Sequence, residues 1–261
     1  LGGESALKAS SYQSSRFEFK YVVSDRKADA IRESIRPHLM PDAFTPKPGV
    51  GYAVNTLYLD SAGLDLCNAT VQGRKNRFKL RLRWYTFASD QPVFFEIKRR
   101  VNDQILKQRV PVQFDAVPDL LAGHLPDREH LFAPHKVDGL GALNEFCRLR
   151  NTIQAKGAVY VRYEREAWVP DEHNLARVTF DRALEGSAYS GSFDISDIKW
   201  ASAQPRGTIL ELKFTDRFPG WMRRLVQDFG LERRSFPKYV SCASGLSAYR
   251  NRLMLAYGET A

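Results

Sequence analysis

The chain has 261 residues, of which 43% are hydrophobic and 26% charged, and these proportions exclude a disordered or fibrous protein. Lysine and arginine outnumber aspartate and glutamate by 39 to 30, and the resulting net charge of +9 favours a polyanionic partner. No apolar run is long enough to cross a membrane. Three widely spaced cysteines without disulfide or zinc spacing favour a reducing compartment, so we expect a cytoplasmic protein.

The predicted elements begin after a leader. Residues 1–11 carry no signal-peptide pattern and are expected to be flexible, whereas residues 12–255 are expected to form one domain. The first strand is predicted over 16–23, and Ser24 is the expected N-cap of a helix that runs to about Ile35. A loop rich in proline follows, and next come, in order, a strand over 52–60, a helical turn over 64–69, a strand over 77–87, and a hairpin of 93–101 and 104–112 around Asn102 and Asp103.

The second half of the chain continues the same mixture of elements. In order, we expect helices over 115–122 and 140–153, strands over 158–169, 176–184 and 208–215, and helices over 219–229 and 239–255. About eight strands result, in an order too irregular for repeated βαβ units. The sequence therefore predicts an α+β fold with an antiparallel sheet.

One strand has an unusual alternation of residue types. From Arg77 to Tyr85 the odd positions are mostly lysine and arginine, and the even positions are apolar. Successive side chains on a strand point to opposite faces, so this strand has one cationic face and one apolar face. Residues on the same face lie about 6.6 Å apart, a spacing that suits a run of phosphates.

Five more strands repeat this alternation with charged residues on the polar side. Those residues are Arg16, Glu18 and Lys20; Glu96 and Lys98; Tyr160, Arg162 and Glu164; Arg177, Thr179 and Asp181; and Glu211 and Lys213. If the strands close into a barrel, the apolar faces pack outward against helices and the charged faces line a water-filled bore. A cationic bore with a few carboxylates is suited to polyphosphate, since lysine and arginine neutralise the oxygens and a carboxylate can hold a bridging divalent metal.

Eight segments carry a resemblance to a known family. They read Arg-Phe-Glu-Phe-Lys-Tyr at 16–21, Val-Asn-Thr-Leu-Tyr-Leu-Asp at 54–60, Arg-Phe-Lys-Leu-Arg-Leu-Arg-Trp-Tyr at 77–85, Phe-Glu-Ile-Lys at 95–98, Tyr-Val-Arg-Tyr-Glu-Arg-Glu-Ala at 160–167, Arg-Val-Thr-Phe-Asp at 177–181, Ile-Leu-Glu-Leu-Lys-Phe at 209–214 and Ser-Phe-Pro-Lys-Tyr at 235–239. In number and order they resemble the vacuolar transporter chaperone (VTC) domain, a CYTH-like branch of the triphosphate tunnel metalloenzymes.

The resemblance implies a tunnel barrel that transfers the γ-phosphoryl group of ATP to a growing polyphosphate chain. It implies that nucleotide and product phosphates bind Lys20, Arg81, Arg83, Lys98, Lys107, Tyr160, Arg162, Arg177, Lys213, Ser235 and Lys238. Lys238, Arg83 and Lys98 would be the catalytic residues among them. Glu211 would hold Mn²⁺ or Mg²⁺, with Glu18 and Glu96 as weaker candidates.

Two positions depart from the pattern of the family. Hydrolytic relatives begin with Glu-x-Glu-x-Lys, and here Arg16 replaces the first glutamate while Glu18 keeps the second. The loss of one carboxylate weakens the hypothesis of hydrolysis with two metal ions and agrees with the VTC branch. The segment around the late lysine usually reads Phe-Ser-Lys-Tyr, and here Pro237 replaces the serine and removes a hydroxyl ligand.

Two alternatives stay open at this point. One is a triphosphatase or cyclase of the same superfamily, which would need a richer acidic lining. The other, of a different class, is a non-catalytic module that binds polyphosphate or inositol phosphates. Nucleic acid is not expected as a partner, since the aromatic residues alternate with the charges and would face away from them. The sequence has no Walker loop, no HExxH and no metal-ligand spacing among its histidines. It names no membrane partner.

Overall fold

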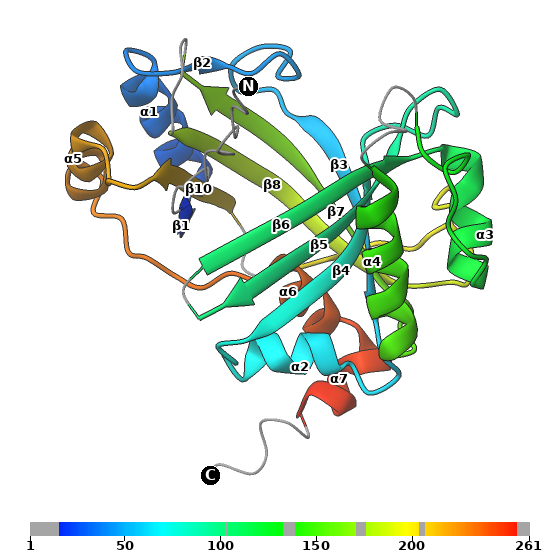
Figure 1. Cartoon of the computed structure of the whole chain (residues 1–261). Helices are drawn as coiled ribbons and strands as arrows, with labels where there is room; N and C mark the ends of the chain where they lie inside the picture. The colour runs from blue at the N-terminus through cyan, green and yellow to red at the C-terminus, as the bar shows by residue number, and fades with distance from the viewer. Residues whose placement is uncertain (1–15, 103, 133–138, 171–175, 204–206, 255–261) are drawn as a thin grey trace, which may run out of the picture.

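The computed structural model describes residues 16–102, 104–132, 139–170, 176–203 and 207–254 (Figure 1). The expected leader over residues 1–11 and the hairpin residue Asp103 lie outside this part of the chain. The strands are β1 (Arg16–Val23), β2 (Met40–Pro41), β3 (Tyr52–Asp60), β4 (Arg77–Trp84), β5 (Val93–Val101), β6 (Gln104–Val112), β7 (Lys156–Val169), β8 (Arg177–Ala188), β9 (Ala201–Ser202) and β10 (Thr208–Thr215).

Helices lie between the strands and after the last of them. They are α1 (Asp25–Ile35), α2 (Asp65–Val71), the 3-10 turn η1 (Phe114–Ala116), α3 (Val117–Ala122), α4 (Gly139–Thr152), α5 (Gly220–Asp228), α6 (Lys238–Gly245) and α7 (Ser247–Met254). The order of strands and helices agrees with the sequence prediction. Ser24 caps α1 as expected, since its side chain accepts a hydrogen bond from the Lys27 amide.

The structure differs from the prediction at several places. The predicted strand over 77–87 ends at Trp84, and the predicted strand over 176–184 continues to Ala188. The predicted final helix over 239–255 is two helices, because Leu246 takes an extended conformation that ends α6 before α7 begins. The two-residue strands β2 and β9 were not predicted, because two residues are too few to show a period of alternation.

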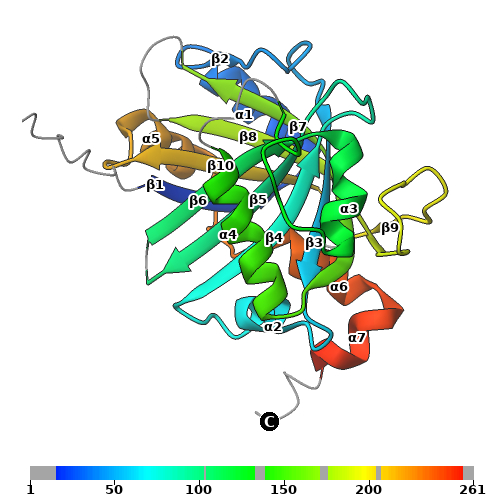
Figure 2. The same ribbon diagram turned by 45° about the vertical axis from the view of Figure 1, so that its right-hand side comes forward.

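All strand pairs in the sheet are antiparallel, as predicted. The main strand order is β1-β10-β8-β7-β3-β4-β5-β6, so β1 and β6 are its two ends. Nevertheless, the Lys98 Nζ on β5 lies 3.4 Å from the Glu18 carboxylate on β1. Strands so far apart in the order meet only if the sheet curls, and Figures 1 and 2 show it as a half-barrel. The face that Glu18 and Lys98 share is therefore the concave face.

Helices cover the convex face through two apolar cores. On one side α1 and α5 pack on β8 and β10, and Ile31, Leu225 and Phe180 belong to one buried cluster there. On the other side α4 packs on β4, β5 and β6, and the Phe146 and Phe95 rings lie 4.9 Å apart. These positions confirm that the apolar residues of the alternating strands β1, β4, β5, β8 and β10 point outward, since burial of apolar surface favours a helix on that face.

Helix α6 packs against the same sheet near one end of the half-barrel. Tyr239 and Cys242 belong to a third apolar core with Val159 and Val161 of β7. The close approach of α6 to β8 requires glycine, since a Cβ on Gly186 would lie 2.5 Å from the Cβ of Cys242. This packing holds the first residue of α6 at a fixed place.

Candidate functional site

Most of the charged residues predicted from the alternation share the concave face. Residues paired across neighbouring strands lie on one face, and the register pairs Arg81 with Glu96, Lys79 with Lys98, and Lys20 with Glu211. Ion pairs connect this set across strands that are not neighbours. The predicted residues that the structure brings together are Glu18, Lys20, Arg81, Arg83, Glu96, Lys98, Lys107, Glu211, Lys213 and Lys238.

Glu211 lies at the centre of the first cluster. Its carboxylate is 2.7 Å from the Lys213 Nζ, 2.7 Å from the Lys238 Nζ, and 3.4 Å from the Lys20 Nζ. Burial raises the pKa of Glu211, but the surrounding cations outweigh burial and hold the pKa well below its ordinary value. Glu211 is therefore a buried anion that several cations share.

Lys238 is the first residue of α6 and is buried beside two carboxylates. Its Nζ lies 2.6 Å from Asp181 and 2.7 Å from Glu211, and it stands 4.9 Å from the centre of the Tyr163 ring. Burial lowers the pKa of Lys238, but Asp181 and Glu211 more than compensate, so the net shift is upward. Lys238 is thus a permanent cation, held in place by charge and by the start of a helix.

A second cluster surrounds the fully buried Glu96. Its carboxylate lies 2.6 Å from Arg81, 2.8 Å from Lys107 and 3.3 Å from Arg109. Glu18 extends the first cluster across to β5, since its carboxylate contacts Lys20 at 3.0 Å and Lys98 at 3.4 Å. Lys98 is opposite Lys107 of the second cluster in the β5–β6 register, so charged residues follow one another along the concave face from β1 and β10 to β4, β5 and β6.

Two cations on this face have incomplete partners. Lys79 makes no ion pair within the described part of the chain, and burial, with repulsion from Lys98 and Lys20, lowers its pKa to about 7. The Nε of Arg83 is buried without a hydrogen-bond acceptor. An unpaired buried cation is costly, so an anionic ligand at these positions would be stabilising.

Two predicted residues lie away from the network. Arg177 is on the concave side, opposite Lys213, but its side chain is 42% exposed and its guanidinium pairs with Asp42 at 2.8 Å. Ser235 is exposed in the segment before α6. We expect these two residues to contact a ligand only where it leaves the charged face.

The expectation that Tyr160 and Arg162 face the charged bore is wrong. The Tyr160 hydroxyl donates to the Ser192 carbonyl, and Arg162 pairs with Glu185 at 2.6 Å and lies 4.2 Å from the Trp200 ring. These partners belong to the convex side. In the β3–β7 register Tyr160 is opposite Leu57, whose side chain is in the convex core under α4.

Tyr163 and Arg165 occupy the concave positions of β7 instead. Arg165 makes two hydrogen bonds of 2.7 Å to Asp181 and lies 3.5 Å from Glu211. The sequence pattern missed them because the odd and the even positions of β7 both carry polar residues. Alternation alone therefore did not show which side of β7 faces the concave side. The neighbouring strand could have decided it, since apolar Leu57 on β3 faces outward and fixes the phase of its partner.

The carboxylates can hold a divalent metal only together with a ligand. Within the described residues no three metal-ligating side chains form a group, and Glu211 is surrounded by cations. A polyphosphate would compete for those lysines and free carboxylate oxygens. Mg²⁺ is often bound by one or two carboxylates plus substrate phosphates, so Glu211, with Glu18 beside Lys20, fits such a shared site.

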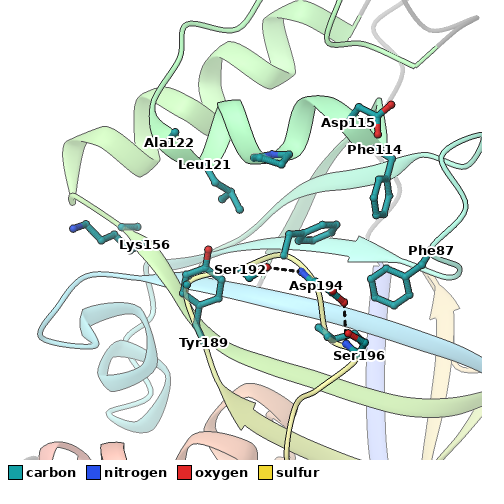
Figure 3. A pocket seen from close by; sticks show the side chains of 16 residues that line it. Phe87, Phe114, Asp115, Leu121, Ala122, Lys156, Tyr189, Ser192, Asp194 and Ser196 are labelled. Carbon is teal, nitrogen blue, oxygen red and sulfur yellow. Dashed lines mark hydrogen bonds between the residues drawn. The ribbon is translucent and has the colours of Figure 1, made fainter.

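A separate cavity of about 1280 Å³ lies on the convex side, between α3 and the segment that follows β8 (Figure 3). Phe87, Phe114 and Tyr189 are among its lining residues, and Asp194 contributes a carboxylate. None of the predicted site residues lines it. The charged face and this cavity are therefore different features of the molecule.

Together, fold and site define a half-barrel protein with a cationic concave face. The sequence profile of the VTC domain family matches residues 15–246, and the chain belongs to that family. A curated relative, vacuolar transporter chaperone complex subunit 4 of Schizosaccharomyces pombe, is 26% identical over an alignment of 284 positions, which covers 95% of this chain. The chain spans 39% of that relative's length. The predicted resemblance is confirmed.

Solved structures with a similar course of the chain come from a bacterium and a plant. A protein of Bacillus halodurans, provisionally named an adenylate cyclase, has a TM-score of 0.48 and 12% identity, with 86% of this chain and 94% of that chain covered. A Hippeastrum protein described as having a dominant triphosphatase activity has a TM-score of 0.48 and 16% identity, with 88% of this chain and 96% of that chain covered.

Among the described helices, none is both long and apolar enough to span a membrane.

Proposed function

We propose that the protein is an ATP-dependent polyphosphate polymerase that transfers the γ-phosphoryl group of ATP to a polyphosphate chain on the concave face. The main observation behind this proposal is the network of cations from β1, β4, β5, β6, β7, β10 and α6 around a few shared carboxylates. Within it, Lys79 and Arg83 are incompletely paired. Membership of the VTC family and the named relative support the same assignment. We propose the cytoplasm as its compartment, where its three buried free cysteines would remain reduced.

Phosphoryl transfer depends mainly on alignment and on neutralisation of charge. The arginines at 81, 83 and 165 are fixed by their strands, so they bind and orient the phosphates of the nucleotide with little reorganisation. Lys238 neutralises the charge on the transferring group. The acceptor is an anionic phosphate that is already deprotonated, so the reaction needs no strong general base.

A divalent metal would be held by Glu211, with Glu18 as the second carboxylate, together with phosphate oxygens of the substrate. When bound, it would supply positive charge that neutralises the phosphate oxygens. The residues of the chain still perform the positioning. Lys20 and Lys213 contact the Glu211 carboxylate, and both lie on the face where the phosphates would bind.

The test is to incubate the protein with ATP and Mn²⁺ or Mg²⁺ and to resolve the product on a polyphosphate gel. We expect long chains together with ADP, and a strong loss of product for Glu211→Gln. Glu145→Gln is the matched control, since Glu145 on α4 also pairs with arginines, Arg99 and Arg148, but on the convex side. Release of orthophosphate without chains would replace the proposal by a triphosphatase, and no consumption of ATP would reject both enzymes.

A further inference from the structure

A row of aromatic side chains borders one end of the charged face. Phe44 lies 6.1 Å from Tyr52, Tyr52 lies 6.0 Å from Tyr85, and Tyr85 lies 6.1 Å from Phe94, all between ring centres. We call these four residues the aromatic rim. The residues come from the loop after β2, the first position of β3, the position after β4, and the second position of β5. The ends of three neighbouring strands therefore bring together rings that are distant in the sequence.

The rim is on the concave side and directly follows the arginines of the site. Phe94 is paired with Arg83, and Tyr52 is paired with Arg165. Tyr85 is the first residue after β4, two positions after Arg83, and its hydroxyl lies 3.4 Å from the Arg109 guanidinium. The Arg109 guanidinium, which also contacts Glu96, covers the Phe94 ring at 3.4 Å. The aromatic rim is thus continuous with the phosphate-binding charges.

Part of the rim is open to solvent. Phe44 is 74% exposed and Tyr85 is 36% exposed, so these rings are not core residues. Neighbouring rings meet at angles of 61° to 71°, edge to face, which does not use both faces of each ring. Beside the rim, the buried Asp42 accepts hydrogen bonds from Arg177 at 2.8 Å and from the Tyr52 hydroxyl at 3.5 Å. Polar groups that can meet the edge of a base are therefore close to the open rings.

We infer that the aromatic rim is a nucleobase site, in which the base of a purine nucleoside triphosphate stacks on Phe44 and Tyr85 while its phosphates extend to Arg83 and Arg165. A ligand that is flat and aromatic at one end and polyanionic at the other matches this juxtaposition of rings and cations. Base stacking on aromatic side chains contributes substantially to nucleotide affinity. The inference rests on the proposed function, since it assigns one end of the same substrate.

If the rings bind the base and the arginines bind the phosphates, a change to the rings should weaken binding of a nucleotide and leave binding of an inorganic polyphosphate unchanged. The experiment measures, by calorimetry with Mg²⁺, the binding of a non-hydrolysable ATP analogue and of inorganic tripolyphosphate. The variants are Phe44→Ala and Tyr85→Leu, and the control is Phe17→Ala, since Phe17 is 39% exposed but packs on Phe214 at the other end of the strand order. We expect each rim variant to bind the ATP analogue about 5- to 150-fold more weakly and to bind tripolyphosphate like the wild type.

The outcomes separate the two proposals. If the wild type binds both ligands and the rim variants weaken neither, or weaken both equally, the nucleobase site is wrong and the phosphate site stands. If the wild type binds neither ligand, the proposed function fails and the nucleobase site falls with it. A matching melting temperature for Phe44→Ala and wild type excludes misfolding as the cause of a selective loss.

Discussion

Lys238 joins two buried acidic residues of the site, Asp181 and Glu211, and this position predicts its role in turnover. For Lys238→Ala we expect kcat to fall by about 10²- to 10³-fold with a smaller change in KM, the usual cost of one preorganised electrostatic group. The fold should survive, since Asp181 still pairs with Arg165 at 2.7 Å and Glu211 still pairs with Lys213 at 2.7 Å. Removal of one partner of a buried ion pair costs about 3–5 kcal/mol when the other charge has no second partner, and the loss of stability here should be smaller.

Steady-state kinetics and a melting temperature test this assignment. Lys238→Arg keeps the charge and should recover part of the activity, whereas Lys27→Ala removes an exposed lysine and should change nothing. Near-normal synthesis by Lys238→Ala would reject the catalytic role. A collapse of the melting temperature that accounts for the lost activity would reject it as well.

Lys79 and Lys107 lead us to expect that ligand binding depends on pH. Burial is the main cause that lowers the pKa of Lys79 to about 7 and that of Lys107 to about 8. A bound anion raises both pKa values, so binding takes up protons and the affinity falls as the pH rises through 7 and 8. From pH 6.5 to 8.5 we expect tripolyphosphate to bind about tenfold more weakly, the equivalent of one pKa unit.

Comparison with Lys79→Met isolates the contribution of this lysine, because both proteins meet the same titrating ligand. The variant should bind more weakly at pH 6.5 and should show a smaller decrease towards pH 8.5. Calorimetry at several pH values gives both quantities. Parallel pH profiles for the two proteins would mean that Lys79 does not titrate in this range.

At the scale of elements, α6 is tied to the sheet through the residue after Lys238. The Tyr239 hydroxyl donates to Asp60 at 2.7 Å, and Asp60 also accepts from the Leu66 and Cys67 amides at the start of α2. The Tyr239 ring stacks on Tyr58 at 4.5 Å, and the Tyr58 hydroxyl contacts Arg81 at 3.3 Å. The end of β3 and the start of α2 thereby fix the helix that presents Lys238.

Tyr239→Phe keeps the ring and removes this hydrogen bond. Loss of a hydrogen bond to a charged group costs about 1.5–3 kcal/mol, and we expect a fall in melting temperature of several degrees. We also expect kcat to fall about tenfold, since α6 can shift and misplace Lys238. Tyr249→Phe is the matched control, because the Tyr249 hydroxyl on α7 donates to the Ala158 carbonyl at 2.9 Å. An equal effect of both variants on kcat would contradict positioning by Tyr239.

Alternation predicted elements well where one phase was wholly apolar. In β4 the even positions are Phe78, Leu80, Leu82 and Trp84, and only one orientation of the strand packs all four side chains in the apolar core. In β7 the odd and the even positions both carry polar side chains, so the pattern did not show whether Arg162 or Arg165 faces the concave side. The pairing of β7 with β3 determines this orientation. The contacts of Lys238 with Asp181 also lay beyond the sequence pattern, because they depend on how α6 packs against β8.

At the scale of the whole molecule, the positive charge is concentrated where the sheet curls. The sequence predicted an antiparallel α+β fold with helices outside, since period-two alternation requires an apolar face to be covered. How far the sheet curls did not follow from it, because curling depends on contacts such as Glu18 with Lys98 between distant strands. Like charges brought together in this way repel, and they reduce the stability of the folded chain without a ligand.

A polyanion should therefore stabilise the whole molecule. A ligand at 100 times its Kd adds about 2.7 kcal/mol to the free energy of unfolding. For a domain of this size that corresponds to a rise in melting temperature of about 5–10 °C, since each kcal/mol is worth about 2–4 °C. We expect tripolyphosphate to give this rise, and sodium chloride at equal ionic strength to give little, because chloride screens the charges without bridging them. Lys20→Ala and Lys98→Ala should reduce the rise, whereas Lys27→Ala should not. Equal shifts with tripolyphosphate and chloride would show that the concave face holds no polyphosphate site.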